Sequence, residues 1–228
     1  MKFSIEKYFV VGPENTGNRA VVPMVKDAIE AGFTCIQLRS KTASARELID
    51  LARETSDLIA SMKKENEVTL LIDDRLDVAL AARDAGAKVD GIHVGQTDIP
   101  VSVCRKYLGP DAVIGLSAPT GDLTRYVQEG NFKDVDYFGA GPFHETETKR
   151  DCGLDEEGNI IYRTLDEINK LVAISPLPIT IGGGVKAEDM KALAETGVDG
   201  FFVVSAIASS EDPKAAAKEL VEKWEAAK

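Results

Sequence analysis

Cationic and amide side chains gather in this sequence where a short apolar run ends. The segment Gln37-Leu38-Arg39-Ser40-Lys41 follows such a run, and alternation along an extended strand directs Gln37, Arg39 and Lys41 to one side. An arginine that faces a protein interior requires an anionic partner, because burial of an unpaired charge is strongly unfavourable. The spacing therefore predicts a site for an anionic ligand. The alternative is an ordinary solvated strand end.

Carboxylates follow the next two apolar runs. Asp73 and Asp74 close the run Thr69–Asp73, and Asp98 comes shortly after the run Gly91–Val94. Mg²⁺ takes a few carboxylate oxygens in proteins, keeps several waters and completes its shell with substrate phosphates. Acidic residues beside an arginine and lysine cluster are thus typical of a site for Mg²⁺ and pyrophosphate. The alternative for both Asp74 and Asp98 is a place at the start of a helix, as its cap.

Glycines and hydroxyls follow the later apolar runs. Gly139-Ala140-Gly141-Pro142 leads into Thr146-Glu147-Thr148-Lys149, which joins a glycine-lined turn to hydroxyls and a cation. Farther along, Gly182-Gly183-Gly184 and Val204-Ser205-Ala206 follow the last two runs. In barrels of parallel strands these positions often bind a phosphate through backbone N–H groups. Three successive glycines exceed what a bare turn requires, so the pattern favours phosphate binding.

The histidines and the first cysteine give no sign of a nucleophile. His93 lies within an apolar run and His144 in a loop, and neither has a serine or cysteine partner at the spacing of a catalytic triad. We interpret His93 as a core residue or a support for site residues, and His144 as a surface residue. Cys35 lies in an apolar run and is interpreted as a small buried hydrophobic residue.

Apolar runs alternate with stretches of helical spacing along the whole chain. The predicted strands are Tyr8–Val11, Cys35–Arg39, Thr69–Asp73, Gly91–Val94, Val113–Ser117, Tyr137–Ala140, Ile179–Ile181 and Gly200–Val204. The predicted helices are Val22–Ala31, Ser44–Lys64, Arg75–Ala85, Val101–Leu108, Leu123–Glu129, Thr164–Ala173, Ala187–Glu195 and Pro213–Ala227. Ser44 and Glu47 form a capping box, and Gly32, Gly86 and Gly197 fall where helices end.

This alternation predicts one α/β fold, a single (β/α)₈ TIM barrel that spans residues 1–228 as one domain. At about 28 residues a unit the chain suits a minimal barrel, whereas an open doubly wound sheet usually has fewer strands. An internal echo, Asp90-Gly91-Ile92-His93-Val94 against Asp199-Gly200-Phe201-Phe202-Val203, supports a repeated unit. In such a barrel the active site lies at the C-terminal ends of the strands, which is where the polar clusters fall.

The composition of the chain indicates which kinds of binding partner and which cellular compartment to expect. The formal net charge is −11, so the mean field repels nucleic acid and anionic lipid. A small anionic substrate remains compatible, because salt screens that field beyond about 8 Å and local charges dominate in a pocket. The three cysteines show neither zinc spacing nor a disulfide framework, and no stretch reaches the roughly 18 apolar residues of a membrane span. We therefore expect a cytoplasmic protein.

Taken in order, the motifs resemble those of the thiamine-phosphate synthase family. The resemblance covers nearly the whole barrel and rests on eight motifs at successive strand ends: Gln37-Leu38-Arg39-Ser40-Lys41, Asp73-Asp74-Arg75-Leu76-Asp77, Gly91-Ile92-His93-Val94-Gly95-Gln96-Thr97-Asp98, Gly115-Leu116-Ser117, Gly139-Ala140-Gly141-Pro142, Thr146-Glu147-Thr148-Lys149, Ile181-Gly182-Gly183-Gly184 and Val204-Ser205-Ala206-Ile207. Each motif alone is weak, but the ordered set is specific.

The resemblance implies a transferase that joins 4-amino-2-methyl-5-(diphosphooxymethyl)pyrimidine to 4-methyl-5-(2-phosphoethyl)thiazole and releases pyrophosphate. The implied mechanism is dissociative and Mg²⁺-assisted. The residues implied for the pyrimidine pyrophosphate are Gln37, Arg39, Lys41, Asp73, Ser117 and Lys149, of which Lys41, Ser117 and Lys149 would act in catalysis. Those implied for the thiazole phosphate are Thr146, Thr148, Gly184, Val204 and Ser205, and those for Mg²⁺ are Asp74 and Asp98. The resemblance also allows a homo-oligomer.

The chain departs from the family pattern at two points. The family often has asparagine where this chain has Asp73, and a histidine commonly follows the serine of strand 5, whereas Ala118-Pro119-Thr120 follows Ser117 here. A related thiazole tautomerase relies on that histidine, so its absence counts against this alternative. Two further alternatives are a non-catalytic barrel that binds a phosphate ligand and a sugar-phosphate isomerase or epimerase, which would need an acid/base pair over a sugar carbon.

Overall fold

Eight parallel strands close into a barrel in the computed structural model, which describes residues 3–119, 121, 123–146 and 160–228. Neighbours in the sequence are neighbours in the barrel, and the last strand pairs with the first. The strands are β1 (Lys7–Val11), β2 (Cys35–Leu38), β3 (Thr69–Asp73), β4 (Gly91–Val94), β5 (Val113–Ser117), β6 (Tyr137–Ala140), β7 (Ile179–Gly182) and β8 (Gly200–Val203). The predicted (β/α)₈ barrel is confirmed.

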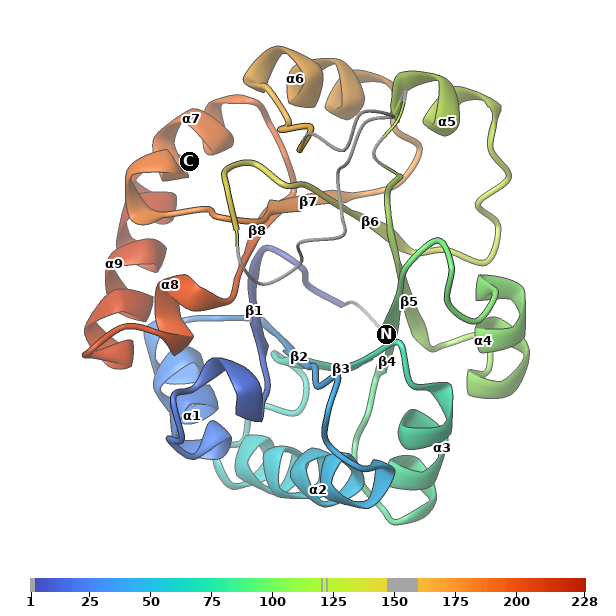
Figure 1. The fold of residues 1–228 in the computed structure, drawn as a ribbon, viewed down its shortest axis with the longest axis vertical. Coiled ribbons are helices and arrows are strands. Elements are labelled where there is room, and N and C mark those ends of the chain that lie inside the picture. The colour runs from blue at the N-terminus through green and yellow to red at the C-terminus, as the bar shows by residue number, and fades with distance from the viewer. Residues whose placement is uncertain (1–2, 120, 122, 147–159) are drawn as a thin grey trace.

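Helices form a ring outside the strands (Figure 1). They are α1 (Val21–Ala31), α2 (Ala45–Ser61), α3 (Leu76–Asp84), α4 (Val101–Leu108), α5 (Leu123–Glu129), α6 (Leu165–Ile174), α7 (Met190–Glu195), α8 (Ser205–Ala208) and α9 (Pro213–Ala226). Two 3₁₀ turns, η1 (Pro13–Asn15) and η2 (Ala187–Asp189), complete the described elements. The sequence prediction merged η2 with α7 and did not include the short helix α8. None of the described helices is long and apolar enough to cross a membrane.

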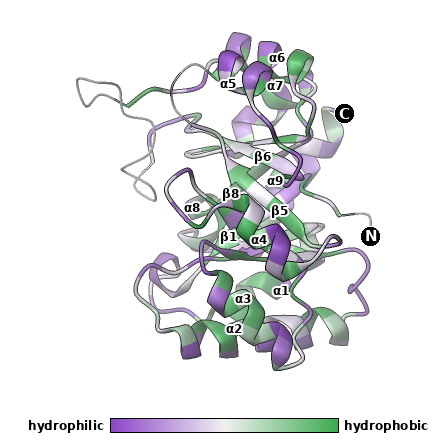
Figure 2. Ribbon diagram, turned by 90° about the vertical axis from the view of Figure 1, so that its right-hand side faces the viewer, coloured by the Kyte–Doolittle hydropathy of each residue, from purple (hydrophilic) through white to green (hydrophobic). Residues whose placement is uncertain are grey.

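Apolar packing occurs on both sides of the barrel wall. One large cluster lies between strands and helices, and Figure 2 shows hydrophobic stretches along the strands beside helices of mixed hydropathy. A second, smaller cluster consists of inward-facing residues: Ile5, Tyr8, Val10, Cys35, Leu71, Val113 and Tyr137. Because this second cluster fills the interior, the polar side chains of the same strands are left to the C-terminal ends.

The internal echo of the sequence has a structural cause. An aspartate stands immediately before β4, β6 and β8, and its carboxylate accepts a hydrogen bond from a backbone N–H at the preceding strand: Asp90 from Leu70 (2.7 Å), Asp136 from Ile114 (2.7 Å) and Asp199 from Ile179 (2.8 Å). The glycine that follows Asp90 allows close strand approach, since a Cβ on Gly91 would lie 1.7 Å from the Val113 carbonyl oxygen. The aspartate and glycine of the repeated motif therefore serve to join neighbouring strands.

The helix boundaries follow the sequence signals closely. The capping box of α2 is present: Ser44 Oγ accepts from the Glu47 N–H at 3.3 Å, and Glu47 Oε2 accepts from the Ser44 N–H at 2.8 Å. Gly32 ends α1 with φ +113°, a left-handed conformation that glycine adopts without the strain of a Cβ. The Ser44 cap thus marks where the mouth loop after β2 ends, and Gly32 marks the turn from α1 into β2 at the other end of the barrel.

Candidate active site

A cavity of ≈ 450 Å³ opens at the C-terminal ends of the strands. It brings together all the predicted site residues that lie in the described part of the chain: Gln37, Arg39, Lys41, Asp73, Asp74, Asp98, Ser117, Thr146, Gly184, Val204 and Ser205. Thr148 and Lys149 lie outside the described residues. Residues separated by more than 160 positions in the sequence thus line one space, as alternation along successive strands predicts.

An ion pair joins the ends of β2 and β3. Arg39 Nε lies 3.2 Å from Asp73 Oδ2, and both side chains are largely buried. Burial raises the pKa of the Asp73 carboxyl to about 7, and the nearby Asp74 carboxylate adds to this while Arg39 opposes it. Asp73 therefore binds its proton more tightly than an ordinary aspartate. When Asp73 is protonated, the positive charge of Arg39 is not neutralised and can attract an anionic ligand.

A second ion pair stands nearer the opening. Lys41 Nζ lies 2.5 Å from Asp74 Oδ2. Burial acts to raise the pKa of Asp74, but the contacts with Lys41, Asp98 and Asp73 together outweigh it, and the pKa falls below its usual value. Asp74 adopts φ +58°, and its backbone N–H donates to the His93 carbonyl at 2.8 Å. This left-handed turn, unusual for a residue with a Cβ, directs the carboxylate into the cavity.

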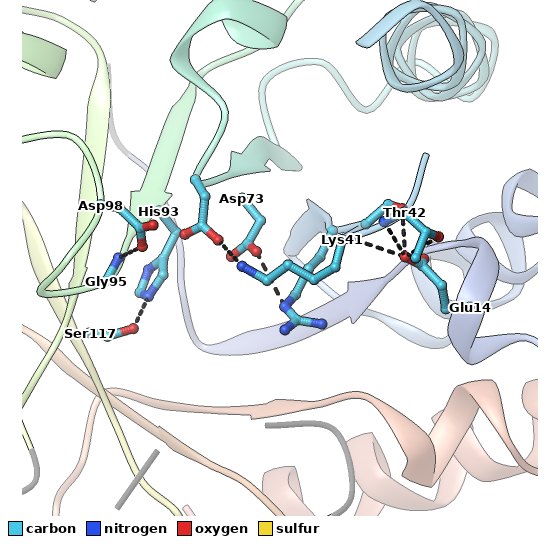
Figure 3. Close-up of polar contacts among 11 residues, drawn as sticks. Glu14, Lys41, Thr42, Asp73, His93, Gly95, Asp98 and Ser117 are labelled. Atoms are coloured by element: carbon cyan, nitrogen blue, oxygen red, sulfur yellow. Dashed lines mark hydrogen bonds and ion pairs between the residues drawn. The ribbon is translucent and has the colours of Figure 1, made fainter. Parts of the chain in front are cut away.

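Asp98 reaches the same space from the loop after β4. Its Oδ2 accepts a hydrogen bond from the Gly95 N–H at 2.8 Å (Figure 3). A Cβ on Gly95 would lie 2.7 Å from that oxygen, so glycine is required for the carboxylate to fold back over the loop. The pKa of Asp98 is raised, first by burial and then by its contact with Asp74.

The alternative that these aspartates cap helices is wrong for both. The N-terminal cap of α3 is Arg75 and that of α4 is Pro100, and neither helix receives a hydrogen bond from a capping side chain. Asp74 and Asp98 instead lie in contact with each other at the cavity, where the Asp74 carboxylate helps to raise the pKa of Asp98. Two adjacent carboxylates whose charges repel are stabilised by a cation between them.

The oxygen donors suit Mg²⁺ better than a transition metal. Asp74 and Asp98 offer carboxylate oxygens only, which is the ligand type of hard cations. Among the described residues, no group of three or more histidine, cysteine and acidic side chains is placed to hold an ion without other ligands. A site of this kind needs oxygens from a substrate and from water, as Mg²⁺ sites commonly do.

A polar chain runs from the cavity into the barrel. His93 Nε2 lies 3.0 Å from Ser117 Oγ, and His93 Nδ1 lies 2.8 Å from the Tyr137 hydroxyl, which in turn lies 2.9 Å from the Tyr8 hydroxyl. A Cβ on Gly115 would come within 2.4 Å of the His93 ring, so this glycine makes room for it. The position agrees with the interpretation of His93 as a support, here for Ser117. The exposed His144 bonds Asp189 at the surface.

The opposite side of the cavity is built from backbone. The loop after β7 packs against the loop after β6, where the Phe143 and His144 N–H groups donate to the carbonyls of Gly182 and Gly183 at 2.9–3.0 Å. Gly184 has φ +72°, and a Cβ on it would lie 2.7 Å from the Glu145 carbonyl oxygen. The glycines therefore allow the two loops to pack closely. They also expose backbone atoms, and not side chains, to the cavity.

Two buried polar atoms of the cavity wall have no hydrogen-bond partner among the described residues. They are Gln37 Nε2, on β2, and Thr180 Oγ1, on β7. A buried polar group without a partner is costly, so such atoms commonly bond a ligand. The sequence pattern identified Gln37, but it missed Thr180, Tyr8 and Tyr137. Inward alternation along β1, β6 and β7 was the available signal for all three.

Comparison with known proteins finds relatives along nearly the whole chain. A family model described as thiamine monophosphate synthase matches residues 7–207. Thiamine-phosphate synthase of Corynebacterium efficiens is 38% identical over 214 residues, which cover 94% of this chain and 92% of that protein. Thiamine-phosphate synthase of Corynebacterium jeikeium is 40% identical over 219 residues, which cover 95% and 93%. A solved structure, thiamine phosphate pyrophosphorylase from Pyrococcus furiosus, has a TM-score of 0.76 at 28% identity and covers 97% of this chain and 96% of its own.

Proposed function

The chain belongs to the thiamine monophosphate synthase family and acts as a transferase of thiamine biosynthesis, and we propose that its reaction follows a dissociative, Mg²⁺-assisted route in the cavity at the barrel mouth. The reaction joins the pyrimidine pyrophosphate to the thiazole phosphate and gives thiamine phosphate and pyrophosphate. The bond between the pyrimidine methylene carbon and oxygen breaks first, and both of its electrons leave with the pyrophosphate. The ring amino group stabilises the resulting cation, and the thiazole nitrogen supplies the electron pair of the new C–N bond.

The observation that carries this proposal is the convergence of Lys41, Asp74 and Asp98 beside Arg39 at one cavity. No protein nucleophile is needed for the dissociative route, because the leaving group departs without one. The requirement is instead for stabilisation of negative charge as it develops, which preorganised cations provide. Arg39 and Lys41 are proposed for that role, together with Lys149, which lies outside the described residues.

Asp74 and Asp98 are proposed to hold Mg²⁺, because their paired carboxylates supply hard oxygen ligands at the cavity. When bound, the ion neutralises charge on the diphosphate oxygens of the substrate. Lys41 reaches the same place through its contact with Asp74 and thereby holds one end of the leaving group. Gln37, Asp73 and Ser117 are proposed to orient the pyrimidine, with Ser117 itself held by His93.

The thiazole phosphate is proposed to bind on the opposite side of the cavity. Thr146, Gly184, Val204 and Ser205 line this side, and Thr148 belongs to the same predicted set. Among the described residues, no backbone carbonyl accepts a hydrogen bond from the Gly184 N–H, so this donor can bond a phosphate oxygen. This arrangement would place the two anionic groups at separate ends of the cavity and the reacting atoms between them.

Activity of the purified protein tests the proposal directly. With both substrates and Mg²⁺ we expect release of one pyrophosphate for each thiamine phosphate formed, and no release when either substrate is omitted or the metal is chelated. Isomerisation of a thiazole without pyrophosphate release would instead indicate the tautomerase. Binding of the thiazole phosphate without any turnover would indicate a non-catalytic barrel, and conversion of a sugar phosphate would indicate an isomerase or epimerase.

We propose that the reaction takes place in the cytoplasm on small-molecule substrates alone. Cys35 and Cys104 are free and buried, which suits a reducing compartment. The formal net charge of −11 disfavours nucleic acid as a partner. A homo-oligomer stays a prediction, which size-exclusion chromatography with light scattering would test.

A further inference from the structure

The loop that carries Lys41 is tied down by an acidic residue that no motif identified. Four hydrogen bonds converge on Glu14 Oε1, from the Ser40 hydroxyl (2.6 Å), the Lys41 N–H (2.8 Å), the Thr42 N–H (3.0 Å) and the Thr42 hydroxyl (2.9 Å). Figure 3 shows the Glu14 carboxylate against the backbone at Thr42 while the Lys41 side chain extends away from it, toward the acidic residues. We propose that Glu14 is a positioning residue that fixes the backbone of Lys41 for the pyrophosphate.

Glu14 is attached close to the barrel wall. It lies on η1, immediately after β1, and β1 pairs with β2 through Val11 and Leu38. A Cβ on Gly12 would lie only 1.6 Å from the Arg39 carbonyl oxygen, so the two loops touch at backbone level and require glycine there. Glu14 therefore ties the backbone of this loop to the end of β1, in addition to the side-chain contact of Lys41 with Asp74.

The ionised carboxylate matches the donors that it binds. Two successive backbone N–H groups and two hydroxyls form a concave site for one anionic oxygen. Partial burial acts to raise the pKa of Glu14, but the hydrogen bonds of the loop outweigh it and lower the pKa from 4.5 to about 2, so the carboxylate is charged at neutral pH. The amide oxygen of a glutamine could accept from the same four donors, but it would bring no negative charge to them.

A fixed backbone matters because Lys41 has to change partners. Its ammonium bonds Asp74 in the structure, and the proposed function, on which this inference rests, requires the same ammonium to bind the diphosphate of the substrate. A lysine side chain has many rotamers. Backbone motion adds further conformations, and it lowers the fraction of them in which the ammonium contacts the leaving group. With the backbone fixed, the exchange requires rotation of the side chain alone.

Kinetics of Glu14 variants test the inference, with Glu54→Gln as the control. Glu54 is an exposed glutamate on α2. We expect Glu14→Ala to lower kcat/KM for the pyrimidine pyrophosphate by about 10- to 100-fold, the range that misplacement of a catalytic group produces. Glu14→Gln should lose less, and KM for the thiazole phosphate should change by less than about twofold in both. Thermal unfolding of each variant shows that the barrel is intact.

A double-mutant cycle separates positioning of Lys41 from a general structural role. Where Glu14 acts through Lys41, Glu14→Ala should have little further effect on kcat/KM in a Lys41→Ala background. Additive losses in the double variant would overturn the inference. Calorimetric titration with inorganic pyrophosphate and Mg²⁺ gives a readout independent of turnover, in which Glu14→Ala should raise Kd by a factor of about 10 or more.

The outcomes distinguish the inference from the function on which it rests. A wild-type protein without Mg²⁺-dependent condensation activity contradicts the proposed function. Normal wild-type activity that Lys41→Ala lowers to a small but measurable rate and Glu14→Ala leaves unchanged contradicts only the role of Glu14. Tighter pyrophosphate binding by Glu14→Gln would also contradict it, because the carboxylate would then be a competitor for the loop donors and not their anchor.

Discussion

The two sides of the cavity are made from different chemistry. The charged side comprises the ends of β2, β3 and β4 and carries Arg39, Lys41 and the aspartates, whose side chains pair with one another across strands. The glycine side comprises the ends of β6, β7 and β8, where loops pack backbone against backbone. One side of the cavity is therefore lined by charged side chains, and the other by backbone that is exposed where glycines carry no side chain. Substitutions should have different consequences on the two sides.

On the charged side a substitution alters charge more than shape. Its ion pairs are partly buried, so removal of one member leaves the other without compensation. On the glycine side an added methyl group meets the neighbouring loop at once. We therefore expect losses in turnover with an intact fold for the first side, and losses in stability and in binding geometry for the second.

The largest effect is expected at Asp74. Asp74→Asn keeps a residue that tolerates φ +58° but removes the negative charge proposed to hold Mg²⁺ and the partner of Lys41. We expect kcat to fall by about 10²–10³-fold, as for the loss of one preorganised electrostatic contact. Asp77→Asn is the matched control, since Asp77 pairs with Arg75 on the exposed surface. Steady-state rates against Mg²⁺ concentration measure both, and equal rates in the two variants would refute the metal assignment.

A smaller loss is expected at Gly184, on the glycine side. Gly184→Ala forces an alanine to φ +72° and places its Cβ 2.7 Å from the Glu145 carbonyl oxygen, so both strain and displacement of the neighbouring loop follow. We expect a loss of about 2 kcal/mol in the free energy of unfolding and about a tenfold rise in KM for the thiazole phosphate.

Gly86→Ala provides the comparison for that substitution. Gly86 has φ +90°, but a Cβ there would meet nothing within 4 Å. Only the conformational strain of about 1 kcal/mol should appear, without any change in KM. Urea unfolding and steady-state kinetics of both variants measure the difference, and a normal KM in Gly184→Ala would remove this loop from the phosphate site.

The sequence predicted the parts of the charged side that obey a local rule. Gln37, Arg39 and Lys41 do line one cavity as alternation predicted, although β2 ends at Leu38 and the last two lie in the loop after it. Strand order brought Asp74 beside them. The left-handed backbone of Asp74 could not be predicted from the sequence, because aspartate can adopt this conformation but usually does not. Glu14 was missed for a stronger reason: its partners are backbone N–H groups and hydroxyls of another loop, and such donors leave no pattern in the sequence.

The fold could be predicted because it, too, follows from local properties of the sequence. Strand and helix types follow from hydrophobic periodicity, which is local, and the closed barrel follows from repetition of one unit eight times. Contacts between elements were not predictable in this way. The hydroxyl and ring pair of Tyr137 and His93 joins β6 to β4, and the space for it depends on Gly115 of a third strand. The four-residue helix α8 is too short for periodicity to indicate.

A pH-dependent loss of stability is expected from Glu14. Its pKa is about 2 in the folded protein against 4.5 ordinarily, so the unfolded chain binds more protons between these values. The stabilisation by Glu14 is therefore complete above about pH 4.5 and is lost as the pH falls toward about 2. Wild type should exceed Glu14→Gln in stability near neutral pH, and the difference should shrink with acidification. Urea unfolding at several pH values measures it, and a constant difference would show that charge is not what the loop recognises.

The smallest effect, and one of opposite sign, is expected at Thr180 on the glycine side. Thr180 Oγ1 is buried without a hydrogen-bond partner among the described residues, and valine has nearly the same shape without the hydroxyl. Because the unsatisfied group no longer loses its hydration on folding, Thr180→Val should raise the free energy of unfolding by about 1 kcal/mol. Thr55→Val is the control, since Thr55 Oγ1 is equally buried and unpartnered but lies on α2, away from the cavity. Both variants should gain stability in urea unfolding, and only Thr180→Val should raise a substrate KM, since Thr180 lines the cavity and Thr55 does not. Equal kinetics in the two variants would mean that the barrel wall tolerates this unpaired hydroxyl for reasons other than substrate binding.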